Sequence, residues 1–464
     1  MEAVPFIFMV NQSPQHPAWL NELLAEGDVY EVGGSVRDRL LAQERGEVAE
    51  IKDRDYLVCR IPIEKLQDIL KKHGTVNLVG RFFGVIKFTP HGGTDTFDLS
   101  LPRLEKSYGV GHTDFQVDFD PNLPVEKDLG RRDFTINAIA EDLRTGQVID
   151  VFNGKEDLKA RILRMVFASA FVEDPLRILR GIQFAARFDL DIEPATYKAM
   201  KESAHLIDSI SAERVAEELN KLLMLAKQPS RGFVLMQRLG ILKRILPELE
   251  ATVGVDQPGP FHKWPVFEHT LECVDAAPPR LNVRWACLLH DINKPQCKVV
   301  TSDRATFYNH DKEGARTAKK VLQRLRYSND LIDEVSNLVD KHMFTTQVSD
   351  KGLRRLIRKV GPELIYDLLD LRRADVHAQG KGGSVEDVAE LEARITAEIE
   401  KKSPFGLKDL AINGGDLMRE FGLPPGPQLG KILHALLEIV LDEPERNTRD
   451  ELMSEAGKLL STNM

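Results

Sequence analysis

Two closely spaced carboxylates follow a glycine turn in residues 31–58, EVGGSVRDRLLAQERGEVAEIKDRDYLV. Asp53 and Asp55 flank Arg54, and the alternation of side chains along a strand would direct both carboxylates to one face. Close carboxylates repel each other unless a cation lies between them, and Mg²⁺ binds such oxygens together with water and phosphate oxygens. The spacing therefore indicates a magnesium site. The alternative is a solvated run of charge after an ordinary turn.

The glycine turn, GGSVRDRLL, precedes a helical pattern. Backbone N–H groups at a helix start bind phosphate, so Gly34 is a candidate phosphate contact, and Arg37 would add a charge-assisted hydrogen bond. The turn and the carboxylates together would clamp a nucleoside triphosphate. Two metal ions would then assist attack at its α-phosphate.

Two later segments extend this candidate site. Asp98 lies in an expected strand, TDTFDLSLPR, and offers a third carboxylate. The segment EKDLGRRDFTINAIAED places Arg131 and Arg132 where guanidinium groups would suit triphosphate oxygens, and Asp133 could accept a hydrogen bond from a ribose hydroxyl. The alternative for Asp133 is an ordinary helix cap.

A base-reading helix is predicted in EDPLRILRGIQFAARF. Asp174 precedes Pro175, which suits a first helical turn, and Arg177, Arg180 and Arg187 share one helical stripe. Cytosine and adenine both present an amine beside a ring-nitrogen acceptor, which an Asp–Arg pair matches, whereas uracil and guanine present the opposite pattern. Asp174 and Arg177 could therefore select C and A without a nucleic-acid template. A solvated charged stripe is the alternative.

The order of these motifs resembles a known family. GGSVRD, DRD, RRDFTINA, EDPLR and RVAEE follow one another as in class II tRNA nucleotidyltransferases, the CCA-adding enzymes. The segments FEHTLECVDAA and ACLLHDINKP resemble the HD domain of many bacterial members, and AINGGDLMREFGLPPGPQLGKILHALLEIVLDEPERNT resembles their C-terminal segment. The resemblance implies a transferase that adds C, C and A to tRNA from CTP and ATP with Mg²⁺ as cofactor.

The resemblance also implies residue roles. Asp53 and Asp55 would bind Mg²⁺, Asp98 would assist the attacking 3′-hydroxyl, Gly34 and Arg37 would hold the triphosphate, Arg131, Arg132 and Asp133 would contact triphosphate and ribose, and Asp174, Arg177 and nearby Arg180 would select the base.

A second chemical site is predicted in the helical half of the chain. His269, His290 and Asp291 fit the pattern H…HD, and Asp375 is a candidate final ligand. Imidazoles and carboxylates bind divalent transition metals, and a metal-bound water would hydrolyse phosphate esters such as 2′,3′-cyclic phosphates. His310 and His342 could complete the site. The alternative is a set of buried or helix-capping polar residues without a metal.

Several functions remain open at this point. Bacterial poly(A) polymerases share the core motifs, and specialists add only CC or only A. The chain could also be an RNA-binding metal phosphohydrolase, or a structural RNA-binding protein without catalysis. The intact carboxylates and the Asp174–Arg177 pair argue against the last reading.

Composition limits the class of protein. The chain has 464 residues, a net charge of −9 and 42% hydrophobic residues, which is ordinary for a globular protein of several domains. The acidic balance argues against a protein that coats nucleic acid through bulk positive charge. The four cysteines show neither paired metal spacing nor a disulfide framework. No apolar run reaches about 18 residues and no secretory signal is evident, so we expect a cytoplasmic protein without membrane spans.

The elements predict an α+β sheet domain of the nucleotidyltransferase (polymerase β-like) type, followed by a mostly α-helical body that includes an HD domain. We expect a head domain over 1–155, a helical neck with the base-selecting residues over 156–250, an HD domain over 251–400 and a helical tail domain over 401–464. Strands are expected at DVYEVGG, DYLVC, FGVIKFTP, TFDLSL and GQVIDVF, and a helix that stops at Gly74 is expected at PIEKLQDILKKHG.

Overall fold

The structure, a computed structural model, divides into two compact units, residues 1–210 and residues 211–464. It describes residues 16–48, 54–79, 84–107, 115–258, 263–300, 305–380, 384–401 and 403–462. Asp53 lies outside these residues.

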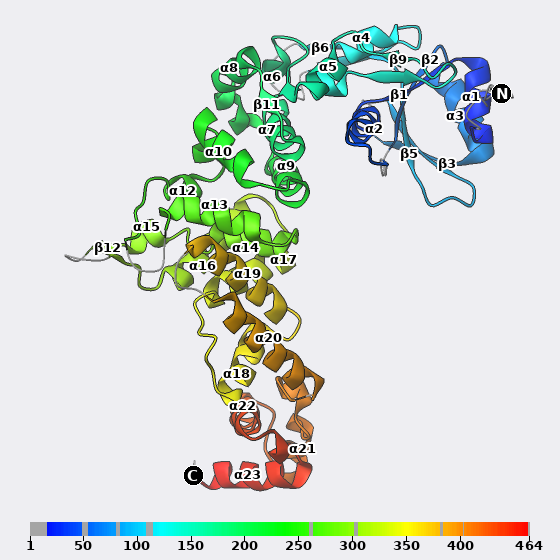
Figure 1. The fold of residues 1–464 in the computed structure, drawn as a ribbon. Coiled ribbons are helices and arrows are strands. Elements are labelled where there is room, and N and C mark those ends of the chain that lie inside the picture. Colours follow the sequence, from blue (N-terminus) through cyan, green and yellow to red (C-terminus); the bar gives the residue numbers. More distant parts are fainter. Residues whose placement is uncertain are drawn as a thin grey trace, which may run out of the picture. The chain divides into compact units, whose positions relative to one another are not determined.

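A seven-stranded mixed sheet forms the core of the first unit, with the strand order β3-β4-β5-β2-β1-β8-β9 (Figure 1). Its strands are β1 (Asp28–Val32), β2 (Asp55–Cys59), β3 (Gly74–Val79), β4 (Val85–Pro90), β5 (Phe97–Ser100), β8 (Ala140–Asp142) and β9 (Val148–Ile149). The pair β2–β5 is parallel, and the other pairs in this sheet are antiparallel. A separate hairpin is formed by β6 (Arg103–Ser107) and β7 (Phe115–Phe119).

The two faces of the sheet are covered differently. Helices α1 (Ala18–Glu26) and α3 (Ile63–His73) pack on one face, where Val58, Phe88 and Leu99 join their apolar side chains in one buried cluster (Figure 1). Leu57 and Cys59 belong to a second cluster on the other face, with α4 (Val125–Leu129). Side chains alternate along a strand, so Asp55 and Asp98 lie on this second face.

Helix α2 (Gly34–Arg45) also lies on the side of the sheet away from α1 and α3 (Figure 1). It follows β1 directly through Gly33, whose φ of 77° favours glycine. The rest of the unit consists of short elements and one longer helix: η1 (Thr135–Asn137), α5 (Gly154–Lys159), β10 (Ile162–Leu163), α6 (Ala170–Glu173), α7 (Leu176–Phe188), β11 (Asp191–Ile192), α8 (Pro194–Glu202) and η2 (Ala204–Ser209).

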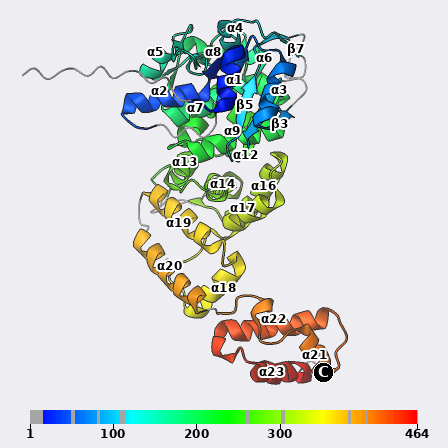
Figure 2. The same ribbon diagram turned by 90° about the vertical axis from the view of Figure 1, so that its right-hand side faces the viewer.

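In its described residues, the second unit is helical apart from one short two-stranded pair (Figure 1). Its elements up to residue 400 are α9 (Ala212–Leu225), α10 (Ser230–Leu239), α11 (Leu242–Ile245), α12 (Pro247–Glu250), α13 (Val266–Ala276), α14 (Leu281–Leu289), α15 (Lys294–Cys297), β12 (Val299–Val300), β13 (Ala305–Thr306), α16 (His310–Arg324), α17 (Asn329–Lys341), α18 (Asp350–Val360), α19 (Ile365–Gln379) and α20 (Val385–Glu400). Helices α13, α14, α16, α17 and α19 gather around a common centre (Figure 2).

The end of the chain has a hydrophobic cluster of its own, in which Leu417, Leu436 and Leu452 are buried. The elements here are η3 (Leu407–Asp409), α21 (Gly414–Phe421), α22 (Pro427–Asp442), η4 (Pro444–Arg446) and α23 (Arg449–Thr462). Buried Arg354 on α18 connects this part to the preceding helices, because its Nε donates to the carbonyl oxygen of Leu441 and its Nη1 to Glu398.

The predicted fold class, a sheet domain followed by a mostly helical body, is confirmed. All five predicted strands and the helix ending at Gly74 are present. One expectation was wrong in detail: residues 156–250 are not helical throughout, because β10 and β11 form a short parallel pair there. The division into four domains stays a prediction. None of the described helices is long and apolar enough to cross a membrane.

Candidate active site

The predicted carboxylates come together at neighbouring strands. Asp55 and Asp98 are paired in the register of β2 and β5, so their side chains leave the same face of the sheet side by side. Asp98 is also paired with Lys87 on β4, and the Lys87 ammonium lies 3.3 Å from Oδ1 of Asp98. Carboxylate oxygens placed side by side are the type of ligand that a hard divalent cation binds. Asp53 precedes Asp55 by two residues but falls outside the described part of the chain.

The glycine turn lies next to these carboxylates, since Val32 of β1 is paired with Asp55. Gly33 donates its N–H to the carbonyl oxygen of Ile139, and α2 begins at Gly34. A Cβ on Gly33 would lie 2.8 Å from Nη1 of Arg132. Position 33 therefore favours glycine for two reasons, its positive φ and the close approach of Arg132.

Arg132 lies directly beside the glycine turn. Its guanidinium reaches Asp128 at 3.4 Å and the carbonyl oxygen of Asn137 at 3.4 Å. Its Nε is buried and has no hydrogen-bond partner among the described residues, and the same is true of the Ser35 hydroxyl in the turn. Buried donors are normally satisfied. A bound anion would satisfy them.

Arg131 occupies a different position. Its guanidinium pairs with buried Asp128 at 2.7 Å, and with Arg103 and Lys127 it lines a hollow of about 480 Å³. This hollow does not include the carboxylates of β2 and β5. Its charged lining consists of these three basic residues and Glu126.

Arg37 is a buried arginine of α2. It is only 4% exposed, donates to Asp38 and Asn137, and lies 4.4 Å over the ring of Phe188. Burial lowers its pKa, and the neighbouring Asp38 opposes this shift. In this geometry Arg37 fixes the start of α2 against the rest of the unit.

Asp133 is the centre of a polar network. Its Oδ2 accepts from Nε of Arg180 at 2.8 Å, and its Oδ1 accepts from Asn137 at 2.9 Å and from the Phe134 N–H at 2.8 Å. Burial would raise the pKa of this carboxyl, but Arg180 and these hydrogen bonds lower it overall. Asp133 does not cap a helix, because η1 starts after Phe134 and no side chain caps it.

The predicted base-reading pair lies at the start of α7. The Asp174 carboxylate accepts from the Leu176 N–H at 3.2 Å. Arg177 is 9% exposed, and its guanidinium donates to the carbonyl oxygens of Ala170 at 3.3 Å and Arg131 at 3.0 Å. These contacts hold the start of α7 to the segment that carries Arg131 and Arg132.

The arginine stripe on α7 is not a solvated face. Arg177 contacts backbone carbonyls, Arg180 pairs with Asp133, and Arg187 lies 4.0 Å from Asp38.

Sequence reasoning missed Lys87 and Asp128. The alternation in FGVIKFTP put Lys87 on a strand face, but no local signal showed that β4 pairs with β5 at Asp98.

Replacing Gly33 by Ala is expected to destabilise the first unit. A residue forced into this backbone region costs on the order of 1–3 kcal/mol, and the new methyl would displace Arg132. We expect thermal unfolding of the full chain to show a transition lowered by roughly 2–8 °C and weaker nucleotide binding.

The adjacent glycine gives a matched control. A Cβ on Gly34 would meet only Nη2 of Arg37, at 3.5 Å, and its φ is not positive. Gly34→Ala should therefore keep the unfolding temperature close to that of the wild type. Equal stability of both variants would contradict the role assigned to Gly33.

The predicted metal ligands of the helical half lie together in the second unit. They form two groups, in each of which one possible ligand atom per residue lies within 4.8 Å of the others. One group contains His269, His290 and Asp375, and the second contains Asp291, His310 and His342. All six side chains are buried. His310 and His342, which the sequence offered only as completing residues, are full members of the cluster.

Electrostatic coupling within this cluster is strong. Burial would lower the pKa of His290, but Asp291 and Asp375 raise it to about 9. Burial and His290 lower the pKa of His342 to about 3. The pKa of Asp291 is well below its usual range, because His290 and Lys294 outweigh the effect of its burial. Such packing of ionisable groups is more typical of a functional centre than of a hydrophobic core.

Comparison with known families covers most of the chain. Residues 29–164 match the poly A polymerase head domain, residues 189–252 the probable RNA and SrmB-binding site of polymerase A, and residues 306–456 a putative tRNA nucleotidyltransferase domain 2.

Curated relatives extend the similarity. The A-adding tRNA nucleotidyltransferase of Deinococcus radiodurans is 36% identical over 342 residues, which is 70% of this chain and 77% of the relative. The multifunctional CCA protein of Methylobacillus flagellatus is 38% identical over 323 residues, 68% of this chain and 73% of the relative.

Solved structures show the same fold. The CCA-adding enzyme of Bacillus stearothermophilus in complex with CTP aligns with a TM-score of 0.70 at 24% identity, covering 96% of this chain and 98% of that chain. The Thermotoga maritima CCA-adding enzyme complexed with tRNA aligns with a TM-score of 0.55 at 23% identity, covering 96% of both chains. The curated relatives show that the chain belongs to the tRNA nucleotidyltransferase and poly(A) polymerase family, whose members are nucleotidyltransferases that depend on divalent metal ions.

Proposed function

We propose that this protein adds C, C and A to the 3′ end of tRNA from CTP and ATP in the cytoplasm, without a nucleic-acid template. The observation that carries the proposal is the pairing of Asp55 with Asp98 beside the glycine turn at Gly33. The Asp174–Arg177 pair, held to the same segment as Arg132, adds a means of choosing the base.

Asp53, Asp55 and Asp98 would hold Mg²⁺, which when bound neutralises charge on the triphosphate and on the attacking oxygen. The 3′-hydroxyl oxygen of the tRNA attacks the α-phosphorus, a new O3′–P bond forms, and the bond to the bridging oxygen breaks so that pyrophosphate leaves. Asp98 orients the hydroxyl in this reaction, and Lys87 fixes the Asp98 carboxylate through their 3.3 Å ion pair. The residues fit a two-ion site, since two carboxylates leave neighbouring strands on one face.

The triphosphate would lie along the glycine turn. The N–H of Gly34 at the start of α2 and the buried Nε of Arg132 are donors suited to its oxygens, and Arg131 adds charge beside them. Arg37 supports this arrangement by holding the start of α2. Asp133 would accept from a ribose hydroxyl, because a carboxylate has about four acceptor positions and its protein partners use three.

The base would meet the start of α7. A carboxylate at Asp174 accepts from the exocyclic amine of cytosine or adenine, and the Arg177 guanidinium donates to the adjacent ring nitrogen. Arg177 uses only part of its five N–H donors on the carbonyls of Ala170 and Arg131. Those two contacts set the direction of the Arg177 guanidinium. Arg180 lies on the same face of α7 one turn later and donates to Asp133.

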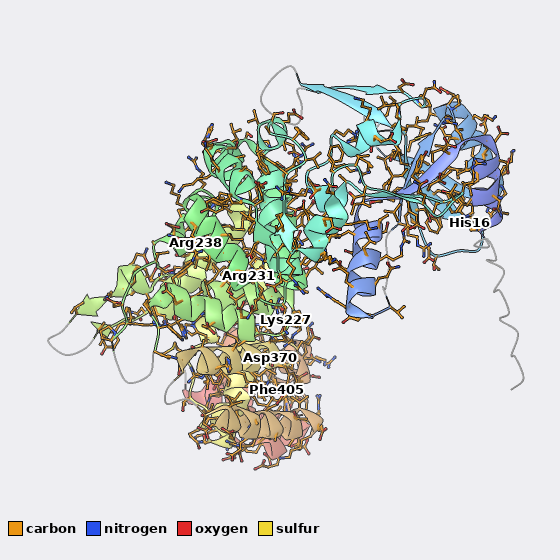
Figure 3. All side chains as sticks on the ribbon, turned by 45° about the horizontal axis from the view of Figure 1, so that its top comes forward. His16, Lys227, Arg231, Arg238, Asp370 and Phe405 are labelled. Carbon is orange, nitrogen blue, oxygen red and sulfur yellow. The ribbon has the colours of Figure 1, made fainter. Side chains whose placement is uncertain are left out.

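A basic stripe in the second unit supports tRNA as the partner. The stripe consists of Lys227, which lies between α9 and α10, and of Arg231 and Arg238 on α10 (Figure 3). Lys227 and Arg238 are exposed. The stripe falls within residues 189–252, which match the RNA-binding family above. Arginine and lysine side chains that neutralise phosphates bind RNA by backbone charge rather than by sequence.

Replacing both Lys227 and Arg238 by Ala is expected to weaken tRNA binding about tenfold or more at physiological salt. If each side chain neutralises one phosphate, the slope of log K against log salt should fall by about 0.7–0.9 for each. Filter binding of a tRNA transcript over a range of salt concentrations would measure both effects. Exposed Lys320 on α16 is the matched control, and Lys320→Ala should leave the slope unchanged. A salt slope unaffected by the double substitution would remove this stripe from the RNA interface.

Nucleotide incorporation into three tRNA transcripts tests the proposed activity. The transcripts end before CCA, after the first C and after CC, and CTP and ATP are supplied singly and together. We expect ordered addition of C, C and A that stops after A. Addition of A alone would place the chain with A-adding enzymes, the activity named for the Deinococcus radiodurans relative. Long A tails would indicate a poly(A) polymerase.

The buried cluster of the second unit favours a second, separate activity. The cluster contains the ligand types that bind a divalent transition metal. Nε2 of His269 and Nε2 of His290 each lie 3.1–3.9 Å from a carboxylate oxygen of Asp291 and of Asp375. A metal-activated water there would hydrolyse phosphomonoesters or cyclic phosphates. Release of p-nitrophenol from bis-p-nitrophenyl phosphate or p-nitrophenyl phosphate by the full chain, with and without added Mn²⁺ or Ni²⁺, tests this activity.

A further inference from the structure

We infer that Lys87 binds the last phosphate of the tRNA 3′ end and thereby sets the position of the attacking hydroxyl. The inference rests on the nucleotidyltransferase function proposed above and adds a contact with the substrate to the ion pair between Lys87 and Asp98. Three observations in the first unit carry it: a row of polar side chains across the sheet, the position of the glycine turn at one end of that row, and the exposure of the other end.

A row of polar residues crosses the sheet at one level. Asn77 on β3 is paired with Lys87 on β4, and Lys87 is paired with Asp98 on β5. Asp98 is paired in turn with Asp55 on β2. Directly paired residues direct their side chains to the same face, and neighbouring strands lie about 4.8 Å apart. The row therefore continues beyond the two carboxylates, to Lys87 and then to the sheet edge at β3.

The glycine turn determines the side from which the tRNA approaches. Gly33 follows Val32, which is paired with Asp55, and β1 lies on the opposite side of β2 from β5. A triphosphate along this turn has its pyrophosphate part on the β1 side of the carboxylates. In an in-line displacement, the attacking oxygen and the leaving group lie on opposite sides of the phosphorus. The 3′-hydroxyl of the tRNA therefore comes from the side of β5 and β4.

The β4 and β3 end of the row is accessible to a substrate. The Lys87 side chain is 47% exposed and that of Asp98 37%, and Asn77 is exposed as well. The apolar cluster on this face includes residues of β1 and β2, and among the described residues none of its members comes from β3, β4 or β5. The alternate residues of β4, Ile86 and Phe88, are buried on the opposite face. The exposed face of β4 thus presents a lysine beside the carboxylates.

The order of groups along the row matches the last nucleotide of the tRNA. The 3′-oxygen of this nucleotide lies next to Asp98, and its own phosphate is one ribose away, further along the row. The Lys87 ammonium lies 3.3 Å from Oδ1 of Asp98. It has three N–H donors, so it can donate to Asp98 and to a phosphate on its other side. Lys87 would bridge the carboxylate and this phosphate, and the Asn77 amide is placed to donate to the same strand.

The simplest alternative is that Lys87 serves Asp98 alone. Ion pairs between half-exposed side chains contribute little to stability, so this contact by itself gives Lys87 a small role. On its other side Lys87 is paired with the neutral Asn77. A carboxylate that also ligates Mg²⁺ compensates less of the lysine charge, and a substrate phosphate supplies the missing negative charge. The alternative predicts that the charge of the tRNA phosphate does not matter to Lys87.

A tRNA with one uncharged linkage tests the inference on the full chain. The tRNA ends in CC and is assembled by ligation, so that the linkage before its last nucleotide is either a phosphodiester or a methylphosphonate. The measured quantity is kcat/KM for the tRNA with ATP and Mg²⁺. We expect Lys87→Met to lower kcat/KM about tenfold on the phosphodiester tRNA and less than about twofold on the methylphosphonate tRNA. The wild type should lose about as much from the uncharged linkage as from the substitution.

Three further variants support the measurement. Lys87→Arg keeps the charge and should retain the dependence on the phosphate. Asn77→Asp places a negative charge beside the same strand without altering Lys87 or Asp98, and it should lower kcat/KM on the phosphodiester tRNA more than on the methylphosphonate tRNA. Lys71→Met is the matched control, because Lys71 is 60% exposed on α3, which covers the opposite face, and it should behave as the wild type. Circular dichroism checks folding.

The outcomes separate this inference from the proposed function. Equal losses from Lys87→Met on both tRNAs would show that Lys87 acts only through Asp98, and would overturn the inference while the proposed function stands. A wild type indifferent to the uncharged linkage would overturn it as well. Failure of the wild type to extend the phosphodiester tRNA would overturn the proposed function and this inference with it.

Discussion

Asp55→Asn should lower the rate of nucleotide addition by at least about 10³-fold, equivalent to about 4 kcal/mol of transition-state stabilisation. The substitution keeps the size of the side chain but removes the charge beside Asp98. Without that charge the site binds divalent cations poorly, and the developing charge at the α-phosphate loses its stabilisation. Single-turnover extension of a tRNA transcript ending in CC, with ATP and Mg²⁺, would measure the rate. Affinity for the tRNA itself should change little.

A carboxylate away from the site provides the control. Asp68 on α3 is 76% exposed and lies on the helix that covers the other face of the sheet. Asp68→Asn should therefore extend the transcript at the wild-type rate. If Asp55→Asn also extended at that rate, the metal site would have to lie elsewhere.

Asp174→Asn should change which bases are accepted. An amide presents N–H donors where the carboxylate presented only acceptors, so uracil O4 gains a partner and the amine of cytosine or adenine loses one. A good bidentate base contact is worth about 1–3 kcal/mol of discrimination, so we expect the preference for CTP over UTP to fall roughly 10–100-fold. The ratio of kcat/KM for the two nucleotides on one transcript is the measurement.

The neighbouring residue Glu173 is a matched control, because it is a carboxylate of the same turn that accepts from Ser169 at 2.7 Å. Glu173→Gln should keep the wild-type preference for CTP. An unchanged preference in Asp174→Asn, with normal folding, would contradict base selection by this residue.

Much of the first unit could be predicted from the sequence because its signals are local. Runs of Val, Ile, Phe and Tyr between turn residues define β1, β2, β4 and β5, and the glycine at residue 74 ends α3. Strand β3 was missed because it begins at that same glycine, directly after the helix and without a separating loop. The short strands β8, β10 and β11 are too brief to give a periodic signal.

The sequence motifs predicted the residue types of the candidate site. They gave little information on the contacts between those residues. The pairing of Asp55 with Asp98 depends on a parallel strand register between segments about forty residues apart, and motif spacing could only suggest it. Arg37 was expected to contact a phosphate, and the motif gave no sign of its contacts with the ring of Phe188 and with Asn137. Such long-range packing cannot be inferred from a helical stripe alone.

The helical half shows the same limit. The adjacent His290–Asp291 pair was visible in the sequence, whereas the equal involvement of His310 and His342 depends on how α16 and α17 pack against α14. A helical pattern gives the faces of each helix. It does not give the neighbour that each face meets.

The most direct test of the central claim is the length of the product formed on a tRNA transcript ending in CC, given only ATP and Mg²⁺ and followed to completion by mass spectrometry. We predict a product longer by one adenylate, formed with release of one pyrophosphate and lost in the Asp53→Ala/Asp55→Ala variant. A tail of many adenylates, no extension at all, or extension that persists in that variant would contradict the account.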